Sequence, residues 1–251
     1  MNRFLIISLF SCLISCGIPK DEHDKLKSEL EKVTQELNEC ANASSNHDEH
    51  HDNHSMEALS VEKRIAFMSG HVEAGLALYR AGKPEQAARH LLHPVSETHQ
   101  AERAGIDALG FKPEVFRAVS KALDEGRPAD EIEPMLKKAE ENILLLQKNS
   151  GGDTNEIIKF LMEKVVEEYD EGVNDGKIVE AGEYQDAFGF SVVTLKMAKR
   201  IENNHSKQLV EEAIKLVKMW PEIGPLADSK PLPLDDISKQ TQNIIKNLTE
   251  H

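Results

Sequence analysis

The sequence predicts an all-α protein: an antiparallel helical bundle at residues 56–251, preceded by a signal peptide, a short coiled-coil stalk and a histidine-rich linker. Two observations support this fold class. Apolar residues recur at three- and four-residue spacing in one segment after another, and glycine or proline separates the segments. No stretch shows the sustained apolar–polar alternation of a half-buried strand. Helices that each have one apolar face are expected to pack together as a bundle.

Residues 1–15 have the features of a bacterial signal peptide in the usual order. One arginine precedes an apolar run from Phe4 to Leu13, which is too short for an ordinary membrane span. The run ends in "LISC", which resembles the lipobox of bacterial lipoproteins and implies that Cys16 is lipidated. "LFSC", ending at Cys12, is a weaker match, and a plain cleaved signal peptide or a short core helix is the alternative. The lipobox predicts a protein outside the cytoplasm, anchored by its lipid to a bacterial membrane and facing the periplasm or the cell surface.

The charge of the chain excludes one class of partner. The formal net charge is −14, and removal of residues 1–15, which contain one arginine and no acid, makes it about −15. Such an acidic chain repels the phosphates of nucleic acids and attracts cations, so nucleic acids are excluded as partners. Cys40 would be the one free thiol of the lipidated chain, so stability must come from a packed core rather than from disulfides.

Residues 16–40 carry the lipid anchor and a predicted stalk helix. Its apolar residues follow the 4-3-4-3 spacing of an a/d seam: Leu26, Leu30, Val33, Leu37 and Cys40. About two heptads are marginal for an isolated helix, so we favour a solvated stalk. A homo-oligomer joined through this seam, with or without a disulfide at Cys40, is the alternative.

The linker at residues 41–55 contains the stretch "HDEHHDNH". Its imidazoles fall at i, i+3, i+4 and i+7, and they belong to His47, His50, His51 and His54. Imidazole suits zinc, copper, nickel and iron, so the tract is predicted to bind metal flexibly. A polar spacer without a ligand is the alternative.

Within residues 56–251, caps, breakers and apolar spacing predict nine helices. They are expected at residues 56–82, 83–94, 96–110, 113–124, 129–148, 155–169, 180–203, 207–219 and 234–248. The first has an apolar face formed by Ile65, Met68, Val72, Leu76 and Tyr79. No G-x-S-x-G, P-loop, H-E-x-x-H, C-x-x-C or glycine-rich dinucleotide turn is present, so no enzyme is predicted.

The histidines of the bundle are candidate metal ligands. His71 borders the apolar face of its helix, and Gly75, one turn further, leaves room for another group. Glu73 points about 200° away from His71 and cannot chelate with it on one regular helix. The other candidates lie at the end of the second helix and just beyond it: His90, His93 and Glu97. Each histidine alone is more often a capping or core residue than a ligand.

Two carboxylates continue a core-facing line on a later helix. Glu183 and Asp186 share the spacing of Phe190, Val193 and Met197. A buried carboxylate is costly without a cation or several donors, so this line predicts a metal or a basic partner. A structural ion pair with Arg64, Arg80 or Arg89 is equally compatible with the pattern.

The segments "GHVEAGLALYRAGKPEQAARHLLHP" and "EYQDAFGF" resemble the helical domain of imelysin-like exported proteins, which are linked to metal uptake. The resemblance covers about residues 57–203. It implies a helical bundle with histidine and carboxylate ligands in a cleft, and it carries over to His71, Glu183 and Asp186. The His-x-x-Glu pattern of that family is not matched, because Ala74 stands three residues after His71.

Together these features predict a lipid-anchored, extracytoplasmic protein that binds a divalent transition metal for capture or uptake and passes it to a transporter or receptor. Zinc is the first choice, because imidazole and carboxylate are both good zinc ligands and no redox-specific thiolate or methionine cluster is present. Iron is the second choice. The competing hypothesis is a structural or adaptor lipoprotein that presents its bundle to a protein partner. A hydrolase is supported by the family resemblance alone.

Overall fold

The computed structural model describes residues 59–96, 103, 105–201 and 206–248. The predicted signal peptide, Cys16, the stalk, the four histidines of the linker and Glu97 lie outside the described residues.

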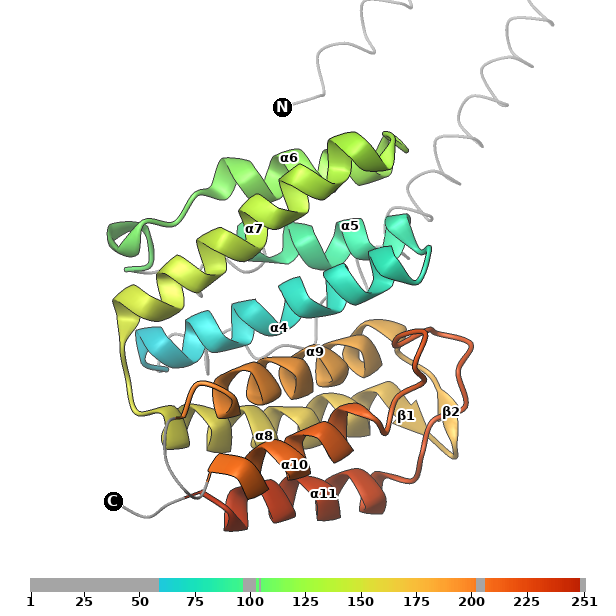
Figure 1. Ribbon diagram of the computed structural model, residues 1–251. Coiled ribbons are helices and arrows are strands. Elements are labelled where there is room, and N and C mark those ends of the chain that lie inside the picture. The colour runs from blue at the N-terminus through green and yellow to red at the C-terminus, as the bar shows by residue number, and fades with distance from the viewer. Residues whose placement is uncertain (1–58, 97–102, 104, 202–205, 249–251) are drawn as a thin grey trace, which may run out of the picture. The chain divides into compact units, whose positions relative to one another are not determined.

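The described chain is all-α, as predicted, with eight α-helices and one short hairpin (Figure 1). The α-helices are α4 (Val61–Arg80), α5 (Pro84–Leu92), α6 (Pro113–Asp124), α7 (Ala129–Ser150), α8 (Thr154–Gly172), α9 (Ala181–Ala198), α10 (Ser206–Val217) and α11 (Leu234–Lys246). Two short 3-10 helices, η1 (His93–Val95) and η3 (Asp107–Leu109), follow α5 and precede α6. The strands β1 (Val173–Asn174) and β2 (Lys177–Ile178) pair antiparallel between α8 and α9. No described helix is both long enough and apolar enough to cross a membrane.

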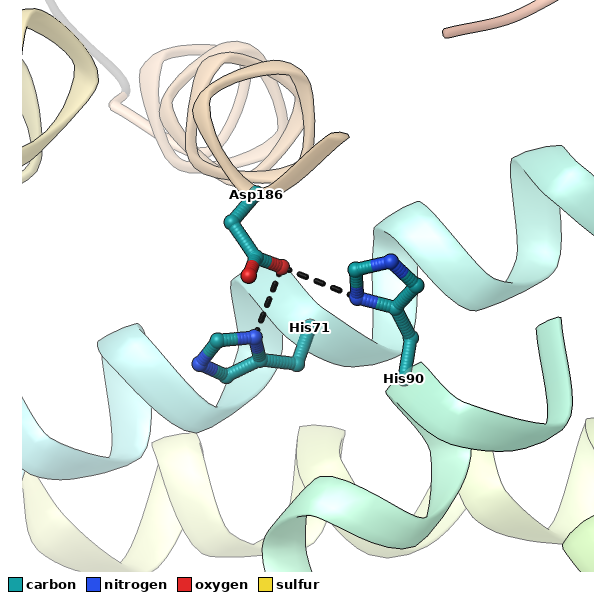
Figure 2. Close-up of side chains that lie close together, drawn as sticks. All are labelled: His71, His90 and Asp186. Carbon is teal, nitrogen blue, oxygen red and sulfur yellow. Dashed lines mark hydrogen bonds and ion pairs between the residues drawn. The ribbon is translucent and has the colours of Figure 1, made fainter. Parts of the chain in front are cut away.

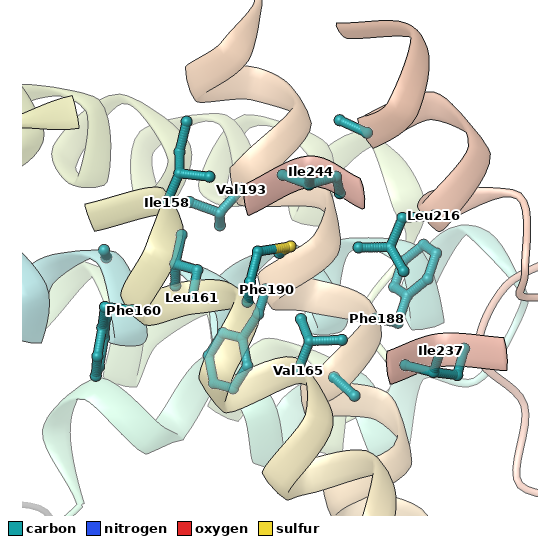
Figure 3. Packing of buried hydrophobic residues seen from close by; sticks show 14 of the residues in the cluster. Ile158, Phe160, Leu161, Val165, Phe188, Phe190, Val193, Leu216, Ile237 and Ile244 are labelled. Carbon is teal, nitrogen blue, oxygen red and sulfur yellow. The ribbon is translucent and has the colours of Figure 1, made fainter. Parts of the chain in front are cut away.

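The helices form two four-helix groups that meet along α4 and α9. In Figure 1, α4 and α9 lie next to each other in the middle, with α5, α6 and α7 above them and α8, α10 and α11 below. We call α4–α7 the first group and α8–α11 the second group. Each group encloses its own cluster of buried apolar side chains. Figure 3 shows that of the second group, where residues of α8 and α9 such as Leu161, Phe188 and Phe190 pack against Leu216, Ile237 and Ile244 of α10 and α11.

The central position of α4 explains why more than one of its faces is buried. The predicted apolar face is buried, with Ile65, Met68, Val72 and Leu76 all in the core of the first group. Phe67, on another face, packs in the core of the second group. Because α4 contacts α9 on one side and α5 and α7 on the other, polar residues on it are also taken out of water.

The structure differs from the predicted local structure near residues 96–110 and between α8 and α9. The described end of the predicted helix at 96–110 contains η3 rather than an α-helix, because Gly105 adopts a left-handed φ of 79° that an α-helix does not accommodate. The hairpin was not predicted. It turns at Asp175 and Gly176, whose φ angles of 50° and 70° are those of a tight turn of the type that joins two antiparallel strands.

Candidate metal centre

Three side chains that are far apart in the sequence meet where the two groups touch. His71 comes from α4, His90 from α5 and Asp186 from α9, and Figure 2 shows the two imidazoles converging on the carboxylate. Nδ1 of His71 lies 2.7 Å from Oδ1 of Asp186, and Nδ1 of His90 lies 3.0 Å from the same oxygen. The residues are 0%, 8% and 5% exposed, respectively. Three of the predicted ligands therefore come together in one buried cluster.

Glycine allows the helices to approach closely enough for this meeting. A Cβ atom at Gly189 of α9 would collide with the backbone of Gly70, and a Cβ atom at Gly70 would collide with the ring of Phe190. Gly70 precedes His71, and Gly189 is three residues after Asp186. On the α5 side, a Cβ atom at Gly75 would lie 2.8 Å from Cγ of Leu91 and 3.4 Å from Cβ of His90. The group for which Gly75 leaves room is thus α5 with its histidine.

The hydrogen bonds specify which nitrogen of each ring faces the carboxylate. An ionised carboxylate only accepts, so Nδ1 of both histidines donates to Oδ1 of Asp186. Nε2 of His90 lies 2.8 Å from Oε1 of Gln185, which also accepts. His90 therefore has an acceptor at each ring nitrogen, and two donated hydrogen bonds require the imidazolium form.

These contacts shift the pKa values of both His90 and Asp186. Burial alone would lower the pKa of His90, but the charge of Asp186 and the hydrogen bonds with Asp186 and Gln185 outweigh it, so the pKa of His90 is raised. Burial alone would raise the pKa of Asp186, but the charges of His71 and His90 and their hydrogen bonds hold it well below its usual range. Without metal, the centre is a buried ion pair between the Asp186 carboxylate and the imidazoles that donate to it.

Aromatic rings surround His71. The ring of His93, on η1, stacks on His71 with centroids 3.4 Å apart and planes inclined by 15°. Phe67 and Phe190 meet the His71 ring edge-on, at centroid distances of 4.8 Å and 5.8 Å. These rings keep water away from the centre and lower the local dielectric constant. His93 thus lies beside the centre as a stacking neighbour and is not one of the three groups that converge on it.

Glu183 belongs to a separate cluster of carboxylates. It lies with Glu168 and Glu171 of α8, with one oxygen of each within 4.8 Å of the others. Burial, the hydrogen bond with Glu183 and the charges of Glu183 and Asp186 raise the pKa of Glu168 well above its usual value. Glu168 was not among the predicted ligands, although Leu161, Val165 and Glu168 fall at i, i+4 and i+7 on the buried face of α8. The signal that nominated Glu183 and Asp186 was therefore present on α8 too.

The donor set of the buried cluster suits a transition metal. One ligand atom from each of His71, His90 and Asp186 lies within 4.8 Å of the others, and two imidazoles with one carboxylate fit zinc and iron(II). The partners of Asp186 are these histidines, not one of the arginines considered for a structural ion pair. Glu73 contacts Nζ of Lys196 instead of the centre, in line with its predicted direction.

The cluster is separate from a large cavity in the described part of the chain. A cavity of about 910 Å³ opens between the ends of α4, α7, α8 and α9, and Glu62, Lys148, Asp153 and Arg200 are among its lining residues. None of the three converging residues lines it. We place the candidate centre at the cluster because convergent ligand atoms from three helices specify a chemistry, whereas the cavity lining mixes both charges with apolar groups.

Part of the chain matches a known protein family. Residues 147–251 match the family described as the iron permease-associated four-helix bundle domain. No curated protein and no solved structure matches the chain. The matched range contains α8–α11, the second group, so Glu183 and Asp186 lie inside it and His71 and His90 lie outside it. The resemblance to imelysin-like proteins stays a prediction. The second group is therefore similar to a helical bundle domain associated with iron permeases, which supports a relation to metal uptake.

Proposed function

We propose that this protein captures a divalent transition metal at His71, His90 and Asp186 and supplies it to an uptake system. The observation that carries the proposal is the meeting of two imidazole nitrogens at one carboxylate oxygen, at 2.7 Å and 3.0 Å, in a buried position between the two helix groups. The similarity of the second group to an iron permease-associated domain gives the uptake role its support.

Metal binding would replace the protons that the three side chains now share. Each imidazole donates its Nδ1 proton to Asp186, and a ligand nitrogen must be unprotonated. A cation between these atoms would offset the negative charge of Asp186 in the same low-dielectric surroundings. A small rearrangement of atoms that already face one another is thus enough to convert the ion pair into a three-ligand site.

Iron(II) and zinc are the two metals to distinguish. Two histidines and one carboxylate with open positions form the set that non-haem iron(II) proteins use, and zinc accepts the same donors. The sequence alone favoured zinc. The family match favours placing iron first, and direct competition between the two ions decides the order.

The competing function is that of a structural or adaptor protein, in which His71, His90 and Asp186 only hold the helices together. A buried ion pair can have that role, and breaking it costs about 3–5 kcal/mol when one partner is left uncompensated. The two functions differ in metal content, because the adaptor needs none.

The test is metal binding by the full chain with the four linker histidines changed to serine, so that the flexible tract does not contribute. The protein is dialysed anaerobically against Fe²⁺ or Zn²⁺, and bound metal is measured by elemental analysis. We expect one tightly bound ion, which Asp186→Asn loses and Asp124→Asn, at an exposed aspartate of α6, retains. Absence of a tight ion, or its retention in Asp186→Asn, would leave the adaptor function as the better explanation. The same measurement on the chain with its linker histidines restored should show additional, weaker binding if the tract concentrates metal.

The proposal also includes a location, which is the outer side of a bacterial membrane. A lipid at Cys16 would hold the protein at a bacterial membrane outside the cytoplasm, where it meets metal before a transporter does. Cys16→Ala should release the protein from the membrane fraction, since it removes the attachment site. Unchanged fractionation would show that another feature anchors the chain.

A further inference from the structure

A chain of two amides, those of the buried Gln185 and the half-buried Gln86, connects the candidate centre to a second point on α5. Oε1 of Gln185 lies 2.8 Å from Nε2 of His90, and Nε2 of Gln185 donates to Oε1 of Gln86 over 2.8 Å. Gln185 is 3% exposed and comes from α9, whereas Gln86 and His90 are on α5. The chain therefore joins the two helices beside the centre.

The direction of this chain determines the proton on His90. Because the amide nitrogen of Gln185 donates to Gln86, its oxygen is the atom that faces the imidazole, and an oxygen only accepts. Nε2 of His90 must then carry a hydrogen. The other nitrogen, Nδ1, faces Asp186, and it is the one that can release its proton to solvent and bind a metal through its lone pair.

We propose that Gln185, itself oriented by Gln86, is a positioning residue that fixes His90 in the orientation and tautomer in which Nδ1 ligates the metal. This inference rests on the metal-binding function proposed above. Gln185 touches a ligand and not the metal. Partners of this kind are found on most metal-ligating histidines, where they hold the ring and increase its basicity.

The position of α5 explains why His90 needs such a partner. This nine-residue helix packs mainly on α4 and α6, so α9 reaches it chiefly through side chains. Without an acceptor at Nε2, the His90 ring could turn and present its other nitrogen, or leave Asp186 altogether. The amide chain removes both alternatives.

The first measurement is zinc affinity by competition with a chromophoric chelator, again with the linker histidines changed to serine. Gln185→Leu should weaken binding by about 10- to 100-fold, the usual loss when the partner of a ligand is removed, while one ion still binds at saturation. Gln185→Glu keeps an acceptor for Nε2, and Gln86 can turn its amide to donate to it, so most of the affinity should return. Gln86→Leu, at a half-buried position, should weaken binding less than Gln185→Leu does.

Gln240→Leu is the matched control. Its amide donates to the backbone and side chain of Glu212 between α10 and α11, so it loses comparable hydrogen bonds away from the centre. Zinc affinity should be unchanged in this variant. An equal loss of affinity in Gln185→Leu and Gln240→Leu would mean that a general loss of stability explains both results, and would overturn the inference.

The second measurement reads the tautomer directly. Long-range ¹H–¹⁵N correlation spectra of the zinc-loaded protein should show His90, assigned by its absence in His90→Ala, with hydrogen on Nε2 and metal on Nδ1. Metal on Nε2 would overturn the inference even if Gln185→Leu weakens binding. Zinc binding that is equally tight in wild type and Gln185→Leu would overturn this inference alone, whereas a wild type that binds no zinc or iron would overturn the proposed function with it.

Discussion

The two four-helix groups are built alike but supply different chemistry. Each has its own apolar cluster, yet the first group contributes the imidazoles of His71 and His90, and the second contributes the carboxylate of Asp186. Only the second group matches the iron permease-associated domain. Neither group holds the full ligand set. The match to the second group therefore supports a relation to metal uptake, but it does not include the two histidines of the candidate centre.

The contact between the two helix groups is tested most strongly where Gly189 meets Gly70. Gly189→Ala places a methyl group against the backbone of Gly70, which cannot move aside as a side chain can. Overpacking typically costs about 1–3 kcal/mol, and a backbone obstacle places this variant at or above the upper end. Chemical denaturation should show this loss, and metal affinity should fall because His71 and Asp186 are separated.

Gly182→Ala on the same helix is the control, because an added Cβ at this position would point into open space. It should be neutral or stabilise the protein by up to about 1 kcal/mol through helix propensity. Equal effects of the two substitutions would show that the close approach at Gly189 has no special importance.

The placement of Asp186 and Glu183 in different clusters gives a second test of how the two helix groups contribute to the centre. Asp186→Asn should abolish the metal-induced rise in stability, which is about 2.7 kcal/mol at a hundredfold excess over the dissociation constant. Glu183→Gln should keep most of that rise, because Glu183 lies with Glu168 and Glu171 rather than with the histidines. Thermal unfolding with and without Zn²⁺ or Fe²⁺ measures both. If Glu183→Gln also loses the rise, the two carboxylates serve one site, as their shared helix face first suggested.

The dependence of stability on pH gives the smallest expected effect. His90 has a raised pKa in the folded protein, so its contribution is complete below its unfolded value of about 6.5 and is lost as the pH rises through the folded value. Glu168 also has a raised pKa, so the stability that its protonation contributes is complete below its unfolded value of about 4.3 and is lost as the pH rises through the folded value. Asp186, whose pKa is lowered, loses its contribution only in stronger acid. The metal-free protein should therefore become less stable from pH 5 to pH 8, whereas metal binding should strengthen over the same range.

Glu168→Gln isolates one part of this slope, because glutamine can still donate to Glu183 and does not titrate. Urea denaturation of the metal-free variant should show a flatter decline than that of the wild type. Glu163→Gln, at an exposed position of the same helix, should leave the slope unchanged. A wild-type stability that rises from pH 5 to pH 8 would contradict the buried protonated states of His90 and Glu168.

The sequence was sufficient for most helices and for part of the centre. The helix at Pro113–Asp124 begins and ends as predicted, because proline at its first position and glycine soon after its end are local signals. His71 and Asp186 could be nominated because each lies on a face that the apolar spacing marks as buried. Gln185 and Glu168 were missed, and Glu183 was grouped with Asp186, because helix periodicity does not say which polar residue of a distant helix lies opposite. That information arises only when α4, α5, α8 and α9 pack together.

The deep burial of the three converging residues also affects how fast a metal ion could enter or leave. A metal ion held by side chains that are at most 8% exposed can enter or leave only when the packing around them opens. The short helix α5 carries His90, so a local opening of this helix would expose the centre and release one of its three proposed ligands in the same step. If the protein binds metal as proposed, the rate of metal exchange would then follow the opening of one nine-residue helix, and a partner that binds the opened form of α5 would speed release.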